Sequence, residues 1–318
     1  MTGGDDELAA ELEALLGRRH PVAAAAVVDG GGATTASIGA GLDADFEIGS
    51  ISKGVTGLLY ADAIERGEVT AATPLGDLLP LADAPVGGVT LGALSTHRSG
   101  LPSLPPSAQP WRRTVALWRH GTNPYGEDLG QLLDQARGAR LGRPRPRYSN
   151  LGFELLGHAL ASAAGTTYAG LLHDRITVPL GLERCYVPAA PEALRSEALT
   201  GVNRRGRRQE PWTGEALAPA GGIRAAIGDM ATLTGALLDG TAPGIAALDP
   251  VAPFSMGYRI GAAWITVETR RRTVTWHNGG TGGFRTWMGL DREAGRGVVV
   301  LSATAAAVDS HGFELLAA

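Results

Sequence analysis

The spacing of apolar residues changes character along the chain. Residues 22–41 contain two short apolar runs around a Gly-rich turn, a pattern typical of a β-hairpin. The stretch from residue 51 to 69 has helical spacing instead. Its apolar positions are Val55, Leu58, Leu59, Ala63 and Ile64. Helical patterns, split by loops rich in proline and glycine, continue through residues 90–200, among them a predicted helix at 150–165.

From about residue 252 the pattern becomes that of strands. The predicted strand segments are residues 256–268, 271–280, 284–291 and 295–304. The last residues, 308–318, predict a short helix, and the first twenty predict an amphipathic helix, with acidic residues first and arginines last. Strands near both ends and helices between them predict an α+β fold, in which the two termini build one antiparallel sheet.

This organisation predicts a single domain over residues 1–318 with two lobes. We expect an α/β lobe at about 1–60 and 215–318, and an inserted helical lobe at about 61–214. With 44% apolar and 19% charged residues, the composition is ordinary for a globular protein. The net charge of −4 gives no general attraction to nucleic acid or to an anionic membrane, so neither is an expected partner.

Location and redox state follow from a few further features. No apolar run reaches the roughly 18 residues of a transmembrane helix, and the N-terminus lacks the order of a signal peptide. We therefore expect a cytoplasmic protein. The one cysteine, Cys185, excludes an internal disulfide.

A single lysine distinguishes one segment from the rest of the chain. Lys53 is the only lysine among 28 basic residues, and it follows Ser50 in an S-x-x-K motif at the predicted helix start. Residues i and i+3 share a helix face, so the amine can reach the serine hydroxyl. A buried amine near a helix N-terminus loses its proton more easily, whereas arginine stays protonated. The alternative is a helix cap followed by a solvated lysine.

Two further motifs carry polar groups suited to catalysis. Tyr148-Ser149-Asn150 precedes a helix, where a phenol and an amide can meet other side chains; a core tyrosine with an N-cap asparagine is the alternative. His277-Asn278-Gly279-Gly280 ends a predicted strand, where glycines let a substrate approach and an N–H can serve as an oxyanion donor. A structural histidine beside a hairpin turn is the alternative there.

In this order and spacing the chain resembles the serine β-lactamase and penicillin-binding-protein family. The resemblance is strongest to the branch with class C β-lactamases, D-alanyl-D-alanine carboxypeptidases and related esterases. It rests on FEIGSISK (46–53), YSN (148–150) and WHNGG (276–280), supported by LSTHRSGLP (94–102) and PAGGIRAAIGDM (219–230). These segments and their flanking strands extend from about residue 22 to 302.

The resemblance implies a β-lactamase/transpeptidase-like fold and a role for each motif residue. Ser50 is the nucleophile that forms an acyl-enzyme, and Lys53 takes or shares its proton. Tyr148 passes a proton to the leaving group and later helps to activate water. Asn150 holds Lys53 and the substrate. The N–H groups of Ser50 and Gly280 form the oxyanion hole, without a metal or organic cofactor.

The third motif departs from the Lys-Thr-Gly common in β-lactamases. His277, Asn278 and Gly279 replace it. Without the lysine and the threonine hydroxyl, we expect weaker binding of a substrate carboxylate. We therefore expect a serine hydrolase that cleaves an ester or amide of a small molecule, with poor β-lactam hydrolysis. The sequence leaves two alternatives open: an acyltransferase that uses the same acyl-enzyme, and a β-lactam-binding module without turnover. The chain is short for the family, which with the missing export signal argues against cell-wall peptide.

Other residues rank lower as functional candidates. His97, His120 and His158 are expected to be structural. Trp111, Trp118 and Trp212 fall in loop-rich stretches where they can line an acyl pocket or the core. The arginines of residues 143–147 predict a solvated basic face that can also attract anionic substrates, and residues 203–208 predict an exposed hairpin turn.

Overall fold

One antiparallel sheet built from both ends of the chain organises the protein. The computed structural model describes residues 2–104, 121–269 and 272–318. Nine strands of these residues form the sheet in the order β1-β3-β2-β11-β10-β9-β8-β7-β6, and β4 pairs with β5 separately. The strands are β1 Thr2–Gly4, β2 Ala23–Asp29, β3 Gly32–Ile38, β4 Asp45–Glu47, β5 Arg224–Ala226, β6 Ala252–Pro253, β7 Arg259–Ile260, β8 Ile265–Glu268, β9 Thr273–Gly280, β10 Arg285–Asp291 and β11 Arg296–Ser302.

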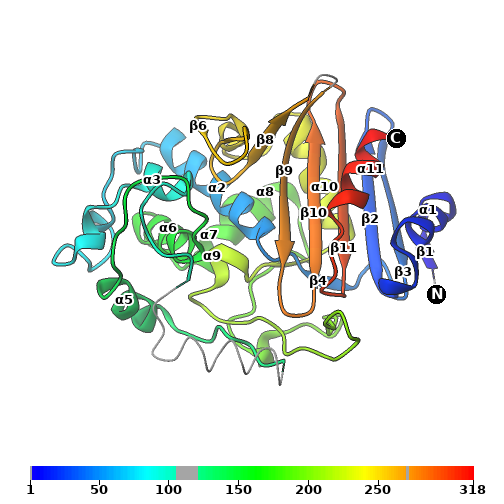
Figure 1. Cartoon of the computed structure of the whole chain (residues 1–318), viewed down its shortest axis with the longest axis horizontal. Helices are drawn as coiled ribbons and strands as arrows, with labels where there is room; N and C mark the ends of the chain where they lie inside the picture. Colours follow the sequence, from blue (N-terminus) through cyan, green and yellow to red (C-terminus); the bar gives the residue numbers. More distant parts are fainter. Residues whose placement is uncertain (1, 105–120, 270–271) are drawn as a thin grey trace.

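Helices cover both faces of this sheet and form a lobe beside it (Figure 1). The α-helices of the described residues are α1 Asp6–Leu16, α2 Ile51–Glu65, α3 Leu91–Ser95, α5 Leu129–Arg137, α6 Asn150–Ala163, α7 Tyr168–Leu172, α8 Val178–Leu180, α9 Ala218–Gly221, α10 Ile227–Leu238 and α11 Asp309–Ala317. Helices α1 and α11 pack on one face, α10 packs on the other, and α2 leads from the sheet into the helical lobe.

The alternation of side chains along β11 separates two hydrophobic cores. Val298 and Val300 join α1 and α11 in the smaller core, whereas Val299 and Leu301 join the larger core shared with α2, α6 and α10. Successive side chains of a strand point to opposite faces, so a continuous Val-Val-Val-Leu run fits a strand buried on both sides. The sheet is therefore a middle layer between two cores, and its strand β9 contacts α2.

The main sequence predictions of the fold are confirmed. The hairpin predicted at residues 22–41 is the β2–β3 pair, and the three later predicted strands are β9, β10 and β11. The predicted terminal helices correspond to α1 and α11. The proposed division into lobes near residues 60 and 214 stays a prediction.

The strand predicted over residues 256–268 is wrong in its middle. The structure instead has a hairpin of β7 and β8, with Ile260 opposite Ile265. Ala263 lies between them with a φ of 69°, in the left-handed region that a strand does not use. Apolar residues continue through this turn because the side chains of Ala262, Ala263 and Trp264 are buried. The pattern of apolar residues therefore could not reveal the break.

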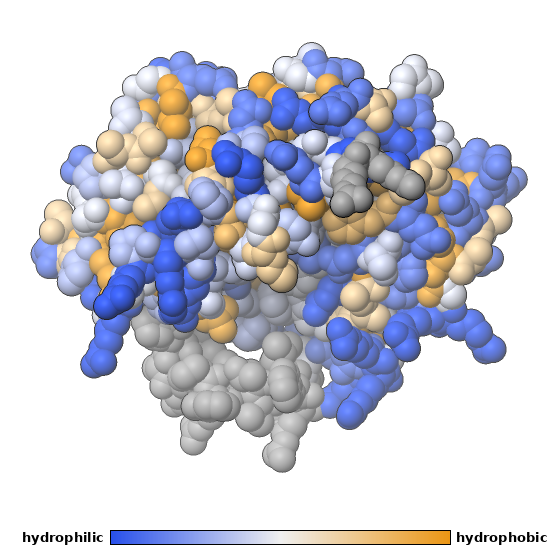
Figure 2. Space-filling model, turned by 45° about the horizontal axis from the view of Figure 1, so that its top comes forward, coloured by the Kyte–Doolittle hydropathy of each residue, from blue (hydrophilic) through white to orange (hydrophobic). Residues whose placement is uncertain are grey.

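The surface is mixed in polarity. Hydrophobic residues occur in scattered groups between hydrophilic ones on the face shown in Figure 2. Among the described residues, the exposed large apolar side chains are Ile64, Leu104, Leu141, Val178, Val251 and Met256. They belong to separate segments, as on ordinary protein surfaces. None of the helices in the described ranges has the length and apolar character needed to cross a membrane.

Candidate active site

Ser50 and Lys53 meet at the start of α2. Ser50 is the N-cap residue of the helix and is half-buried. The Lys53 amine donates hydrogen bonds to the Ser50 hydroxyl, at 3.0 Å between Nζ and Oγ, and to the Ala220 carbonyl. Lys53 is 0% exposed, so the alternative of a solvated lysine is wrong. The S-x-x-K spacing thus produces a direct contact between a candidate nucleophile and a buried amine.

Burial changes the chemistry of that amine. Removal from water lowers the pKa of Lys53 to about 7, and the nearby Glu154 carboxyl opposes this change by raising it. Near neutral pH a substantial share of Lys53 is therefore an uncharged amine, which can accept a proton. A guanidinium in the same place would stay charged.

Tyr148 contacts both Ser50 and Lys53. A side-chain hydrogen bond joins it to Ser50, and the Lys53 Nζ lies 4.9 Å from the centre of its ring. Burial raises the pKa of Tyr148, with the Ser50 hydrogen bond acting in the opposite direction. The phenol is therefore protonated at neutral pH and can donate a proton. Ser50, Lys53 and Tyr148 form one connected group.

The ring of His97 packs against the ring of Tyr148. The two rings are 4.5 Å apart between centres. The His97 Nδ1 accepts a hydrogen bond from the Ser149 N–H at 3.2 Å, and its carbonyl accepts one from Arg147 N–H. Burial lowers the pKa of His97 well below its ordinary value, so the ring is neutral. His97 thus has the structural role that was expected. The residues that it supports, Tyr148 and Ser149, belong to the candidate site.

Asn150 begins α6 within the same region. The N-cap of α6 is Ser149, whose hydroxyl accepts a hydrogen bond from Gly152 N–H, so the alternative of an Asn150 cap is wrong. The Asn150 amide donates to the Tyr125 hydroxyl at 3.1 Å. Its Oδ1 is buried without a hydrogen-bond partner in the described part of the chain. The implied bond to Lys53 is thus not formed here, although an acceptor remains free for it or for a substrate.

The end of β9 lies directly against the residues before Ser50. A Cβ on Gly49, which has a φ of 55°, would lie 2.5 Å from the backbone nitrogen of Gly280. A Cβ on Gly279 would collide with the Ile48 carbonyl, which also accepts a hydrogen bond from the Thr286 hydroxyl at 2.8 Å. The absence of side chains on these glycines therefore lets the two segments pack closely, and the Gly280 backbone nitrogen lies against Gly49, the residue before Ser50.

His277 and Asn278 point to opposite faces of β9. His277 is 1% exposed, and burial, with a smaller effect of Lys53, lowers its pKa to about 4. Its Nδ1 lies 2.7 Å from the Asn278 carbonyl and so carries the ring proton. The Asn278 side chain bonds to Asp309 of α11, away from the Lys53 side. Only His277 presents its ring toward the site, as a neutral imidazole.

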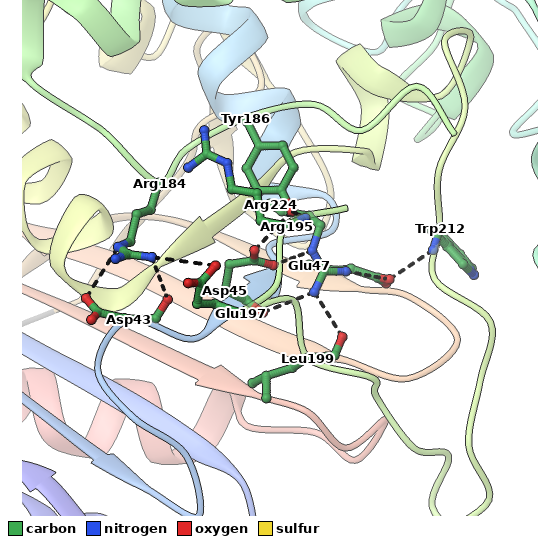
Figure 3. Close-up of polar contacts among 10 residues, drawn as sticks. All are labelled: Asp43, Asp45, Glu47, Arg184, Tyr186, Arg195, Glu197, Leu199, Trp212 and Arg224. Atoms are coloured by element: carbon green, nitrogen blue, oxygen red, sulfur yellow. Dashed lines mark hydrogen bonds and ion pairs between the residues drawn. The ribbon is translucent and has the colours of Figure 1, made fainter. Parts of the chain in front are cut away.

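A second buried charge cluster supports the segment before Ser50 (Figure 3). Arg224 on β5 pairs with both carboxylates of β4, those of Asp45 and Glu47. Glu47 also accepts a hydrogen bond from Trp212 N–H and interacts with the Thr281 hydroxyl. Burial raises the pKa of Glu47, and Arg224 opposes this rise. The cluster joins β4 to Thr281, the residue after Gly280.

The lower-ranked candidates take structural or surface positions. His158 bonds to the Glu215 carbonyl, and Trp212 packs its ring on Tyr125. The arginines of residues 143–147 are exposed, and residues 203–208 form the predicted exposed turn. Trp111, Trp118 and His120 lie outside the described residues. The described part of the chain contains no group of three or more His, Cys, Asp or Glu side chains that could hold a metal ion.

Tyr125 and Glu154 are members of the site that sequence reasoning missed. Tyr125 bonds to Asn150 from a loop whose sequence carries no distinctive motif. Glu154 had a detectable signal, because it is the one acidic residue within the apolar helix NLGFELLGHALASA. An acidic residue flanked by buried Phe153 and Leu155 and one helical turn after Asn150 indicates a functional carboxyl.

The chain belongs to the Beta-lactamase family, whose profile matches residues 8–316. Its fold is shared with a class C β-lactamase from Rhodobacter sphaeroides, at a TM-score of 0.78 and 25% identity over 95% of each chain. A β-lactamase/D-alanine carboxypeptidase from Pseudomonas syringae is similar at a TM-score of 0.81 and 18% identity, over 97% of this chain and 95% of that one. The predicted β-lactamase/transpeptidase-like fold is confirmed.

Sequence relatives cover less of the chain. The D-alanyl-D-alanine-carboxypeptidase/endopeptidase AmpH of Escherichia coli is 32% identical over 158 residues, which span 48% of this chain and 40% of AmpH. A β-lactamase of the same organism is 27% identical over 192 residues, or 58% of this chain and 46% of the enzyme. The chain thus matches less than half the length of these relatives.

Proposed function

We propose that this protein is a serine hydrolase that cleaves an ester or amide bond of a small molecule through an acyl-enzyme on Ser50. The 3.0 Å contact between Lys53 Nζ and Ser50 Oγ, at a helix start that faces the end of β9, is the observation that carries the proposal. It supplies a nucleophile with an adjacent base. Membership of the Beta-lactamase family supports the same chemistry.

Acylation begins with transfer of the Ser50 hydroxyl proton to the Lys53 amine. The Ser50 oxygen bonds to the substrate carbonyl carbon, and the carbonyl oxygen becomes an oxyanion. The N–H groups of Ser50 and Gly280 stabilise this charge. As the bond to the leaving group breaks, Tyr148 donates a proton to that group and regains one from the Lys53 ammonium, so protons and charge balance.

Deacylation repeats these steps with water. A water oxygen bonds to the acyl carbon, and Tyr148, which contacts Ser50 and Lys53, directs the released water proton toward the Lys53 amine. The acyl carbon then releases Ser50, whose oxygen takes that proton back. Asn150, with a free Oδ1, is suited to accept a hydrogen bond from a substrate amide.

The side chains near the end of β9 support a proposal for the substrate class. The names of the relatives point to β-lactams and to peptides ending in D-alanyl-D-alanine. Here β9 offers a neutral His277 instead of a lysine, and the side chain of Asn278 is bound to Asp309. Because a substrate carboxylate gains little from a neutral ring, we propose that uncharged esters and amides are preferred over β-lactams.

Covalent labelling tests the nucleophile directly. A fluorophosphonate probe should label Ser50, and peptide mapping by mass spectrometry should place the label there. Ser50→Ala should abolish labelling. Ser52→Ala is the matched control, because Ser52 is a buried neighbour whose hydroxyl bonds to Ile223 N–H. A label on Ser52 or Ser149 would contradict the assignment.

Steady-state kinetics tests the substrate class. The ratio kcat/KM should be higher for small p-nitrophenyl esters than for benzylpenicillin or a cephalosporin. A higher value for the β-lactams would show that His277 does not impair carboxylate binding. Product analysis with added alcohols or amines separates hydrolysis from acyl transfer, since an acyltransferase would form the new ester or amide.

A further inference from the structure

Glu154 is a buried carboxyl group that the mechanism above does not use. It lies on α6 between Phe153 and Leu155, which are 0% exposed, and is itself 1% exposed. Neither of its carboxylate oxygens has a hydrogen-bond partner among the described residues. A carboxyl group buried without such partners is unfavourable in its ionised form, so a nearby compensating cation is expected.

Glu154 lies on the helix that packs beside the one carrying Lys53, and the two groups interact electrostatically. Asn150 and Glu154 are four residues apart, so they lie on one face of the helix. Helix α6 packs against α2, which carries Lys53. The Asn150 Oδ1 on this face also lacks a partner within the described ranges. Three acceptor oxygens without donors are thus gathered on the face of α6 near Lys53.

Lys53 has a matching capacity to donate. An ammonium carries three N–H groups, and two have acceptors, the Ser50 hydroxyl and the Ala220 carbonyl. The two charged groups interact: Glu154 raises the pKa of Lys53, and Lys53 opposes the rise that burial causes in the pKa of Glu154, which reaches about 8. They therefore titrate as a coupled pair.

We propose that Glu154 is a positioning residue for Lys53, whose buried carboxyl group on the Asn150 face of α6 sets the protonation state of the amine that receives the Ser50 proton. The role in catalysis rests on the function proposed above. With one proton on the pair, that proton can sit on either group, so Lys53 becomes a free amine when Glu154 holds it. The Ser50 proton then moves to Lys53 and leaves through Tyr148.

Other titratable groups also surround this pair. His97 and His277 face Lys53 and are neutral, since burial lowers the pKa of each. Burial raises the pKa of Tyr125, which faces Glu154 and is therefore protonated. Glu127 also faces Glu154 and raises its pKa. Glu154 is the group whose charge counteracts the loss of the Lys53 proton.

The single lysine of the chain allows a direct test. Protein labelled with ¹³C and ¹⁵N only in lysine gives one side-chain NMR signal, and its titration reports the pKa of Lys53. In Glu154→Gln that pKa should fall by about one unit, because the opposing carboxylate is gone. Glu154→Asp should bring it back toward the wild-type value. Glu65→Gln, an exposed change on α2, should leave it unchanged.

An unchanged Lys53 titration in folded Glu154→Gln would overturn the proposal. Wild-type protein offers a test that does not depend on the folding of a variant: the signal should show a second inflection where Glu154 titrates, and a single inflection would also overturn it. These measurements need no substrate. Their failure is therefore distinguishable from a failure of Ser50 labelling, which would contradict the proposed function instead.

Kinetics then connects the pair to catalysis. The acid side of the kcat/KM profile should move to lower pH in Glu154→Gln, by about the shift seen in the NMR titration, because Lys53 stays deprotonated further into acid. A merely structural role would lower activity or thermal stability without moving the profile. A lower Lys53 pKa with an unmoved profile would show that Glu154 does not act through Lys53 in catalysis.

Discussion

Two buried charge clusters support Ser50, and they differ in how completely their polar atoms are bonded. In the first, all three guanidinium nitrogens of Arg224 have acceptors on Asp45, Glu47 and Leu199 (Figure 3). The Asp45 carboxylate also accepts from the Tyr186 hydroxyl. In the second, Lys53 and Glu154 lie near each other, and the Glu154 oxygens have no donors in the described part of the chain.

This difference in hydrogen bonding suggests a structural role for the Arg224 cluster and a chemical role for the Lys53–Glu154 cluster. An ion pair whose guanidinium nitrogens all have acceptors favours one charge state, because removing either charge leaves the other buried and unpaired. It can therefore fix the geometry of β4 and the segment leading to Ser50. A cluster with unused acceptors has charge states that lie close in energy, and it can exchange a proton during a reaction. The first cluster should thus control folding, and the second should control turnover.

Arg224→Leu should break the first cluster and lower the free energy of unfolding by about 3–5 kcal/mol, since two buried carboxylates lose their cation. Chemical denaturation measures this change. Arg184→Leu is a matched control, because Arg184 is about one-third exposed in its ion pairs with Asp43 and Glu197 and should cost at most about 1 kcal/mol. Equal losses in the two variants would remove the distinction between the clusters.

Lys53→Arg should lower activity instead of stability. The charge stays, but a guanidinium cannot accept the Ser50 proton, so kcat/KM should fall by roughly 10³-fold, about 4 kcal/mol of transition-state stabilisation. Higher pH should not restore activity. The thermal midpoint must be measured in parallel, because the larger side chain can disturb packing. A folded variant within about tenfold of wild-type activity would disprove the role of Lys53 as a base.

Tyr148→Phe tests whether Tyr148 takes part in proton transfer together with Lys53. The ring can still pack on His97, but the proton donor is lost, so turnover of an amide substrate should slow by roughly 10²-fold. Tyr258→Phe is the control, since Tyr258 packs on Trp276, a neighbour that points away from His277 on β9. An unchanged kcat in Tyr148→Phe would make Tyr148 a packing residue.

The pH dependence of stability tests the neutral state of His277. Its pKa is about 4 in the folded protein, below its ordinary value near 6.5, so the unfolded chain binds more protons between these values. Its contribution is present above pH 6.5 and is lost as the pH falls. From pH 7 to 5, wild type should lose about 1–2 kcal/mol more than His277→Gln. Exposed His173→Gln should follow wild type, and equal losses in all three would mean that His277 is not neutral.

The Ser-x-x-Lys contact was predictable because it is local. Two residues three positions apart at a helix start must share a face, and arginine could not supply a neutral amine. The strands β2, β3, β9, β10 and β11 were predictable for a similar reason, since strand patterns depend on short segments. The β7–β8 turn was missed because apolar residues fill it as they would a strand.

The sequence by itself determined the helix start with Ser50 and Lys53, the sheet built from both termini, and the order of the three motifs. Only the tertiary structure decided that Lys53 is fully buried, that Glu154 joins it from α6, and that β9 places Gly280 against Gly49. The physical reason is the distance along the sequence over which each kind of interaction acts. Local patterns fix which groups share one element, whereas burial and electrostatic coupling depend on how distant elements pack, and these set the pKa of the amine.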